Sequence, residues 1–174
     1  MSIHLPTAPP EAVEALRKHL ASLPAAPVGF SGLLAVYSAG AQDVFDERVL
    51  EAASLTAWQT IVSKAGEAVA TAEVDADLQH PHVHEGAFVK GMAEAVRRAE
   101  ARFADDNRDY ELRLLRIPAM YTAALWLHAA DADVLLPVEP VPGALRASDS
   151  YGAHAFAAAM RPLAESALRE PDVT

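Results

Sequence analysis

The chain has 174 residues, no cysteine and a formal net charge of −10, with 52% hydrophobic and 22% charged residues. These values exclude a disordered chain, a disulfide-stapled domain and a thiolate metal site. Phosphate backbones and anionic lipids are repelled by so acidic a protein, so we expect neither nucleic acid nor a membrane as a partner. The length predicts one globular domain over residues 1–174, with a flexible arm at 1–9 and a frayed end at 170–174.

The sequence also gives expectations about compartment and source. No apolar run reaches the roughly 20 residues that a membrane span needs, and the first residues lack the basic and apolar regions of a secretory signal. The absence of cysteine suits a reducing compartment, so we expect a cytoplasmic protein. The alanine-rich composition, in which arginine far outnumbers lysine, is typical of a GC-rich bacterial genome.

Hydrophobic periodicity and turn residues define the elements of the first half. In chain order they are a helix at 10–23, a strand at 33–38, a short helix at 43–53, and a hairpin of strands 55–63 and 68–78. The first helix starts at Pro10, where a missing backbone donor costs nothing. In the second hairpin strand, small and apolar residues alternate with acidic ones, which predicts one packed face and one polar face.

The second half begins with a loop at 79–85 and a helix at 85–104. The helix is predicted from a stripe at helical spacing: Phe88, Met92, Ala95, Val96, Ala99 and Phe103. Three apolar stretches at 110–117, 119–128 and 134–138 come next, and they form the most apolar part of the chain. We interpret them as strands because prolines interrupt them, with a helix at 119–130 as the alternative. A last helix begins after a cap at 148–150, and Pro162 predicts a kink or break in it.

This order of elements predicts the α+β class. Most strand connections read as hairpins, so we expect a mostly antiparallel sheet of about five or six strands. The helices are expected to pack on one face of that sheet.

Four residues form a candidate metal site: His80, His82, His84 and Glu85. In an extended segment, alternate imidazoles point the same way and could converge on one ion. The alternative is a solvated loop before a helix, in which Glu85 favours the positive helix end. We favour the loop and expect no bound metal or other cofactor, because Pro81 restrains the segment and no fourth ligand can be named.

Acidic residues of the second hairpin strand, Glu73, Asp75 and Asp77, share one face. Two close carboxylates could supply a general acid. We favour a solvated face, because alternate residues on a strand lie about 6–7 Å apart and water screens them.

Large aromatic residues give a candidate ligand pocket. Trp58, Tyr121 and Trp126 would line it, with His128 or Glu73 as polar groups. The alternative places these aromatic residues in the core, where they contribute most to packing.

No catalytic or phosphate-binding motif stands out, so the sequence does not define a function. Our first hypothesis is a non-catalytic protein that acts through a protein partner, as an accessory subunit or as a homo-oligomer. The alternative is a small-molecule-binding domain or enzyme with its pocket between sheet and helices.

Overall fold

The computed structural model describes residues 2–24, 29–30 and 32–169. Nine strands are described: β1 Ser2–His4, β2 Gly29–Phe30, β3 Leu34–Ser38, β4 Ser54–Lys64, β5 Glu67–Asp75, β6 His82–His84, β7 Asp109–Ile117, β8 Thr122–Ala129 and β9 Ala132–Pro137. The helices are α1 Pro10–Ala21, α2 Ala41–Phe45, α3 Ala87–Arg102, the 3₁₀ turn η1 Pro118–Met120, and α4 Ala153–Arg169. The predicted α+β class is therefore confirmed, and the end at 170–174 lies outside the described residues.

All nine strands belong to one sheet. Its main path runs β6-β5-β4-β3-β7-β8-β9, with β1 paired to β7 and β2 paired to β4. The pairs β3–β7 and β1–β7 are parallel, and the others are antiparallel. The prediction of a mostly antiparallel sheet of five or six strands is therefore wrong: the two halves of the chain join through a parallel pair, which no hairpin connection could reveal.

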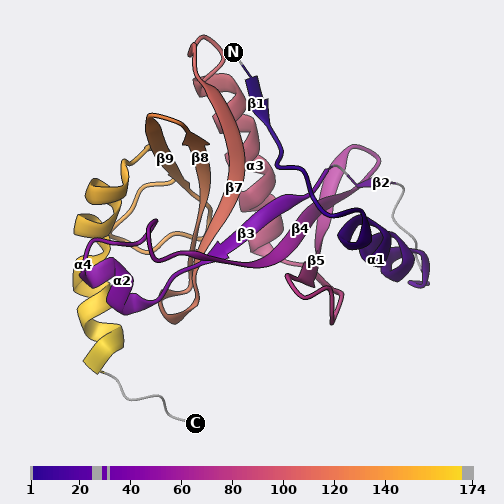
Figure 1. The fold of residues 1–174 in the computed structure, drawn as a ribbon, viewed down its shortest axis with the longest axis horizontal. Coiled ribbons are helices and arrows are strands. Elements are labelled where there is room, and N and C mark those ends of the chain that lie inside the picture. The colour runs from indigo at the N-terminus through magenta and orange to yellow at the C-terminus, as the bar shows by residue number, and fades with distance from the viewer. Residues whose placement is uncertain (1, 25–28, 31, 170–174) are drawn as a thin grey trace.

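Helices cover both faces of the sheet, so the prediction of helices on one face is also wrong. One core cluster joins α3 to Leu114 and Leu125, while a second joins α2 and α4 to Leu115 and Ala124. Adjacent strand residues point to opposite faces, so these two clusters lie on opposite sides of the sheet. α1 packs separately against β4 and β5, and it stands at the other end of the molecule from α4 (Figure 1).

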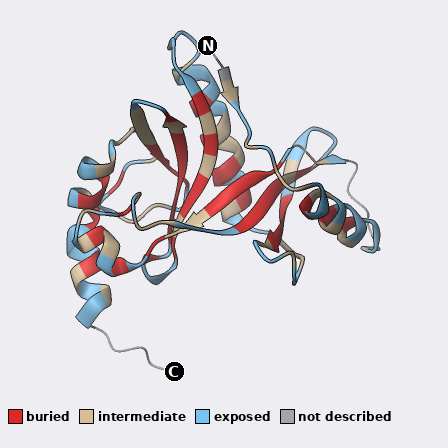
Figure 2. Cartoon of the chain, viewed as in Figure 1, coloured by how far each residue is buried: buried red, intermediate tan, exposed pale blue. Residues whose placement is uncertain are grey.

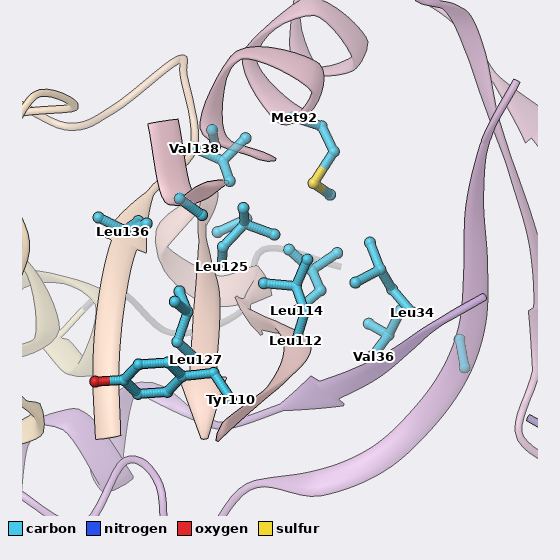
Figure 3. Packing of buried hydrophobic residues seen from close by; sticks show 14 of the residues in the cluster. Leu34, Val36, Met92, Tyr110, Leu112, Leu114, Leu125, Leu127, Leu136 and Val138 are labelled. Carbon is cyan, nitrogen blue, oxygen red and sulfur yellow. The ribbon is translucent and has the colours of Figure 1, made fainter. Parts of the chain in front are cut away.

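The α3 face holds an apolar cluster of 15 buried residues. Met92, fully buried, lies above Leu114 and Leu125, and the Tyr110 ring lies beside Leu127 (Figure 3). Of the predicted stripe on α3, Met92, Ala95 and Ala99 are buried and the other three residues pack at its margin. The predicted register of this helix is confirmed.

The apolar stretch around 119–130 is a strand, as we favoured, and the helical alternative is wrong. Pro118 opens the short turn η1, and β8 then pairs with β7 and β9 in two antiparallel ladders. Several elements differ from prediction. The short helix predicted at 43–53 is the five-residue helix α2 at Ala41–Phe45. The residues predicted as a loop before α3 contain β6, and α4 runs without a break through Pro162. At the N-terminus, β1 occupies part of the predicted arm.

The two outer edges of the sheet are covered differently. On β9, Leu135 exchanges two backbone hydrogen bonds with Tyr151, and Arg98 donates to the Pro137 carbonyl. At the other edge, the short strand β6 pairs with residues Thr71–Glu73 of β5. The pairing of β5 with β4 contains a bulge, in which Val69 has no partner residue on β4. Capped ends and bulges of this kind keep edge strands from pairing with other chains.

Buried residues line the strands between the helices, whereas the outer faces of α1 and α4 are exposed (Figure 2). Among the described helices, none is both long enough and apolar enough to cross a bilayer.

Candidate functional site

An open cleft of about 1070 Å³ lies between α3 and the tip of the β4–β5 hairpin. Its floor is formed by side chains of Ile61, Ser63 and Ala68, and the segment Glu139–Val141 closes one side. Ala65 and Gly66 both adopt positive φ, as a two-residue hairpin turn requires, and this turn forms the far rim. The small side chains of Ser63 and Ala68, and the absence of one at Gly66, leave this space open.

Gly91 fixes how closely α3 approaches the wall of this cleft. A Cβ atom at this position would collide with the backbone of Glu139, including its carbonyl oxygen. Only glycine therefore lets the segment after β9 pass against the helix. This contact sets the distance between α3 and the sheet at the cleft.

The charged groups of the cleft lie at its rim. Lys90, Glu94 and Arg97 come from α3, while Glu67 and Glu139 come from the hairpin and the segment after β9. Glu94 and Arg97 form an ion pair with each other. Lys90 therefore stands against two carboxylates, and the rim carries a net negative charge.

A buried polar cluster adjoins the floor of the cleft. Arg116 donates to both carboxylate oxygens of Glu73, at 2.8 and 2.5 Å, and to Oε1 of Gln59 at 2.9 Å. The Glu73 side chain is only 7% exposed. The prediction of a solvated carboxylate face is therefore wrong for Glu73, because an arginine 43 residues away covers it.

Two polar atoms beside this cluster have no partner among the described residues: Nε2 of Gln59 and Oγ1 of Thr71. Both side chains are almost fully buried. Thr71 pairs with Ile61 in the ladder, so it lies next to the floor of the cleft. Buried polar groups without partners cost free energy, and they are uncommon in native folds.

The predicted histidine cluster does not converge on one point. His80 faces Asp75, with 3.3 Å between Nδ1 and Oδ2, and His82 lies 3.7 Å from a Glu73 oxygen. The His82 and His84 rings stack edge to face, with centroids 4.6 Å apart. Among the described residues, which include Glu85, no group of three or more potential ligands could hold a metal ion.

The fold lowers the pKa of His84. Partial burial lowers the pKa of His84, and repulsion from a protonated His82 and from Arg116 lowers it further, while Glu73 opposes the shift. The neutral ring is thus favoured at this edge of the sheet.

Trp126 and His128, both on β8, lie on the face of the sheet opposite to α3, with their rings in edge-to-face contact. Asp133 accepts hydrogen bonds from the Trp126 indole at 2.6 Å and from Nδ1 of His128 at 2.8 Å. The Arg113 guanidinium lies over the rings of Trp126 and Tyr37, at 4.8 and 5.1 Å from their centroids. These contacts satisfy the polar groups internally, which suits a role in packing.

The remaining pocket candidates lie elsewhere. Trp58 is 7% exposed and packs in the α1 cluster, whereas Tyr121 is 95% exposed in a left-handed turn between η1 and β8. Glu73 points to the α3 face and Trp126 to the other face. The five candidates therefore do not surround one space, and none of them lines the cleft beside α3.

Sequence reasoning missed Arg116, Gln59 and the cleft itself. Arg116 lies in the apolar stretch 110–117, and no local pattern marked its partner 43 residues away. One pattern could have found the cleft: the small residues Ala65, Gly66 and Ala68 cluster at the hairpin tip. Comparisons with protein-family models, curated proteins and solved structures give no match for this chain.

Proposed function

We propose that this chain is a non-catalytic binding protein and that the cleft beside α3 receives a segment of a partner protein. The cleft's shape carries the proposal, because it is open along its length and has an apolar floor under a charged rim. Protein interfaces have this arrangement, with apolar contacts at the centre and polar groups around them. A helix laid into such a groove inserts side chains spaced by three or four residues.

The negative charge around the cleft indicates which kind of partner segment would bind there. The rim has a net negative charge and the whole chain carries −10. An amphipathic segment with one apolar face and basic flanks complements both features, and its charge also favours fast encounter.

The polar groups near the cleft support binding over catalysis. Arg116 engages both oxygens of Glu73, and the Glu73 side chain is only 7% exposed, so this carboxylate is poorly placed to exchange a proton with a bound molecule. A small-molecule site is the second candidate, because a volume of about 1070 Å³ matches the size of ligand pockets.

A titration by NMR distinguishes the candidates. The probe is a synthetic amphipathic helix of leucine and lysine, compared with a scrambled peptide and a leucine–glutamate version. We expect the backbone amide resonances of Ala68, Lys90 and Gly91 to change chemical shift saturably with the first peptide only. Ala68→Trp fills the floor and should weaken binding at least about tenfold, or about 1.4 kcal/mol, while Ala158→Trp on the exposed side of α4 should not.

Equal binding of the scrambled peptide, or full affinity in Ala68→Trp, would refute the proposal. Shifts at the same amides with small aromatic fragments, but with none of the peptides, would favour the small-molecule candidate. Light scattering of the free protein tests the homo-oligomer, which would appear as a whole multiple of the mass of the chain.

A further inference from the structure

A second pocket, of about 310 Å³, lies at the other end of α3. Its walls come from the last turns of α3, from β9, and from the segment before α4. The lining residues are Arg98, Ala101, Arg102, Leu136, Ala147 and Ser148. The pocket shares no lining residue with the cleft beside the hairpin, so a ligand could bind here whether or not the cleft receives a partner segment.

Two arginines one turn apart dominate this pocket. Residues four apart lie on the same side of a helix, so Arg98 and Arg102 present neighbouring guanidinium groups. Each is held by a backbone carbonyl. Arg98 Nη2 donates to the Pro137 oxygen at 3.0 Å, and Arg102 Nη1 donates to the Ser148 oxygen at 3.2 Å.

Neither guanidinium has a carboxylate within 4.0 Å in the described part of the chain, where the adjacent Arg97 pairs with Glu94. In a chain of net charge −10, two neighbouring arginines without acidic partners stand out. The pocket therefore holds two positive charges that form no ion pair with any described side chain.

Arg98 supplies a further observation. Its Nε–H group is buried and has no acceptor among the described residues. A buried donor without an acceptor costs free energy, and the cost is larger for a charged group. An oxygen atom entering the adjoining pocket, with a small rotation of the side chain, would remove this cost.

We propose that Arg98 and Arg102 bind the phosphate group of a small phosphate monoester in this pocket. The planar fork of arginine fits phosphate oxygens with paired hydrogen bonds. Two positive charges match the charge of a phosphate monoester, which is close to −2 at neutral pH, better than the single charge of a carboxylate. The volume lies at the lower end of the range for ligand pockets, which fits a small molecule.

The chain's acidity favours a small molecule over larger phosphates. Nucleic acids and anionic membranes present many phosphates, and a chain of net charge −10 repels them. A single phosphate group that enters a pocket experiences mainly the two local guanidinium groups, because solvent screens more distant charges.

Phenyl phosphate and inorganic phosphate are the probes, titrated into the ¹⁵N-labelled protein with the Arg98 Nε–H resonance as readout. Sodium chloride at matched ionic strength and acetate are the controls. We expect saturable binding of both phosphates, with a shift of the Arg98 resonance. Arg102→Gln should weaken binding at least about tenfold, because it removes a charged donor to the phosphate. Arg97→Gln should change affinity less than about twofold, because Arg97 does not line the pocket.

Three outcomes would overturn this assignment. One is no saturation beyond the effect of sodium chloride, and another is equal loss in Arg97→Gln and Arg102→Gln. The third is acetate binding as tightly as phosphate, which would mean that the pocket does not discriminate by charge. Arg98→Gln provides a second test at the other guanidinium, and its folding is checked by the unchanged amide spectrum of the α1 residues.

Discussion

Arg116 on β7 donates hydrogen bonds to both carboxylate oxygens of Glu73 on β5, at 2.8 and 2.5 Å. The two bonds span β4 and β3, which lie between these strands in the sheet. The pair ties the first half of the sheet to the second, next to the parallel contact of β3 with β7 that joins the two halves. Arg116 also donates to Gln59, so one guanidinium joins residues of three strands.

Removal of one member of this pair should be costly. Arg116→Met leaves Glu73 buried without its partner, and we expect the free energy of unfolding to fall by about 3 kcal/mol. The double variant Arg116→Met with Glu73→Met should recover most of that loss. Urea denaturation gives each value, and Arg17→Met, at an exposed pair with Glu14, is the control with an expected change below about 0.5 kcal/mol.

Two buried threonines allow a matched comparison of hydrogen bonding. Thr71 Oγ1 lacks a described partner, whereas Thr60 Oγ1 donates to the Ile61 carbonyl. Thr71→Val keeps the shape and removes an unpaired hydroxyl, so we expect stability to rise by about 1 kcal/mol. Thr60→Val should lower stability, and a gain in both variants would show that the hydroxyl of Thr71 is not the cause.

Stability should depend on pH through His84. Its pKa in the folded protein lies below the value of 6.5 for a free imidazole, mainly because of burial. As the pH falls through 6.5, the unfolded chain takes up a proton that the folded protein does not, so the free energy of unfolding decreases. It stops decreasing below the folded pKa.

NMR titration of the His84 ring measures this pKa directly. His82→Gln removes the repulsion between the two imidazoles and should raise the pKa of His84 towards 6.5. His84→Gln should flatten the dependence of stability on pH in the same range. A pKa of His84 at or above 6.5 in the native chain would contradict both expectations.

Zinc should not stabilise the fold. The His82 Nδ1–H group is positioned to donate to the His80 carbonyl at 2.8 Å, and His80 itself turns towards Asp75. We expect no change in Tm with Zn²⁺ or with EDTA, measured by differential scanning fluorimetry. A rise with Zn²⁺ that disappears in His82→Ala would show that the loop rearranges to bind metal.

The α3 stripe should show graded costs. Met92 is fully buried, so Met92→Ala should lower stability by about 2–5 kcal/mol. Phe88 and Phe103 lie at the margin of the cluster, so each change to alanine should cost less than the about 3–5 kcal/mol of a fully buried phenylalanine. A cost below about 0.5 kcal/mol for Met92→Ala, as for a surface substitution, would mean that the helix is rotated from this register.

Local sequence patterns predicted the elements that extend over many residues. The 16 residues of α3 carry a full apolar stripe, and the strands β4 and β5 flank a short turn, so both were predictable. Strand β6 spans only three residues, too few for alternation to distinguish it from a loop.

Long-range pairings escaped prediction for a different reason. The parallel contact of β3 with β7 and the bond between Arg116 and Glu73 join residues far apart in the chain, and no local preference encodes them. The histidines and Glu73 were recognised as polar candidates, yet their grouping depends on the register of β6 against β5. The sequence therefore predicts which residues are candidates better than it predicts which of them meet.

The capped edge of β9 has a consequence for the protein at high concentration. The backbone N–H and C=O of Leu135 are hydrogen-bonded to Tyr151, and the Pro137 carbonyl accepts from Arg98. A strand from another chain therefore finds few free backbone groups on β9 with which to pair. Fibril growth by sheet extension at the β9 edge would first have to detach the segment around Tyr151. We therefore expect the residues just before α4 to block strand pairing at this edge. Their removal by proteolysis should shorten the lag time of fibril formation.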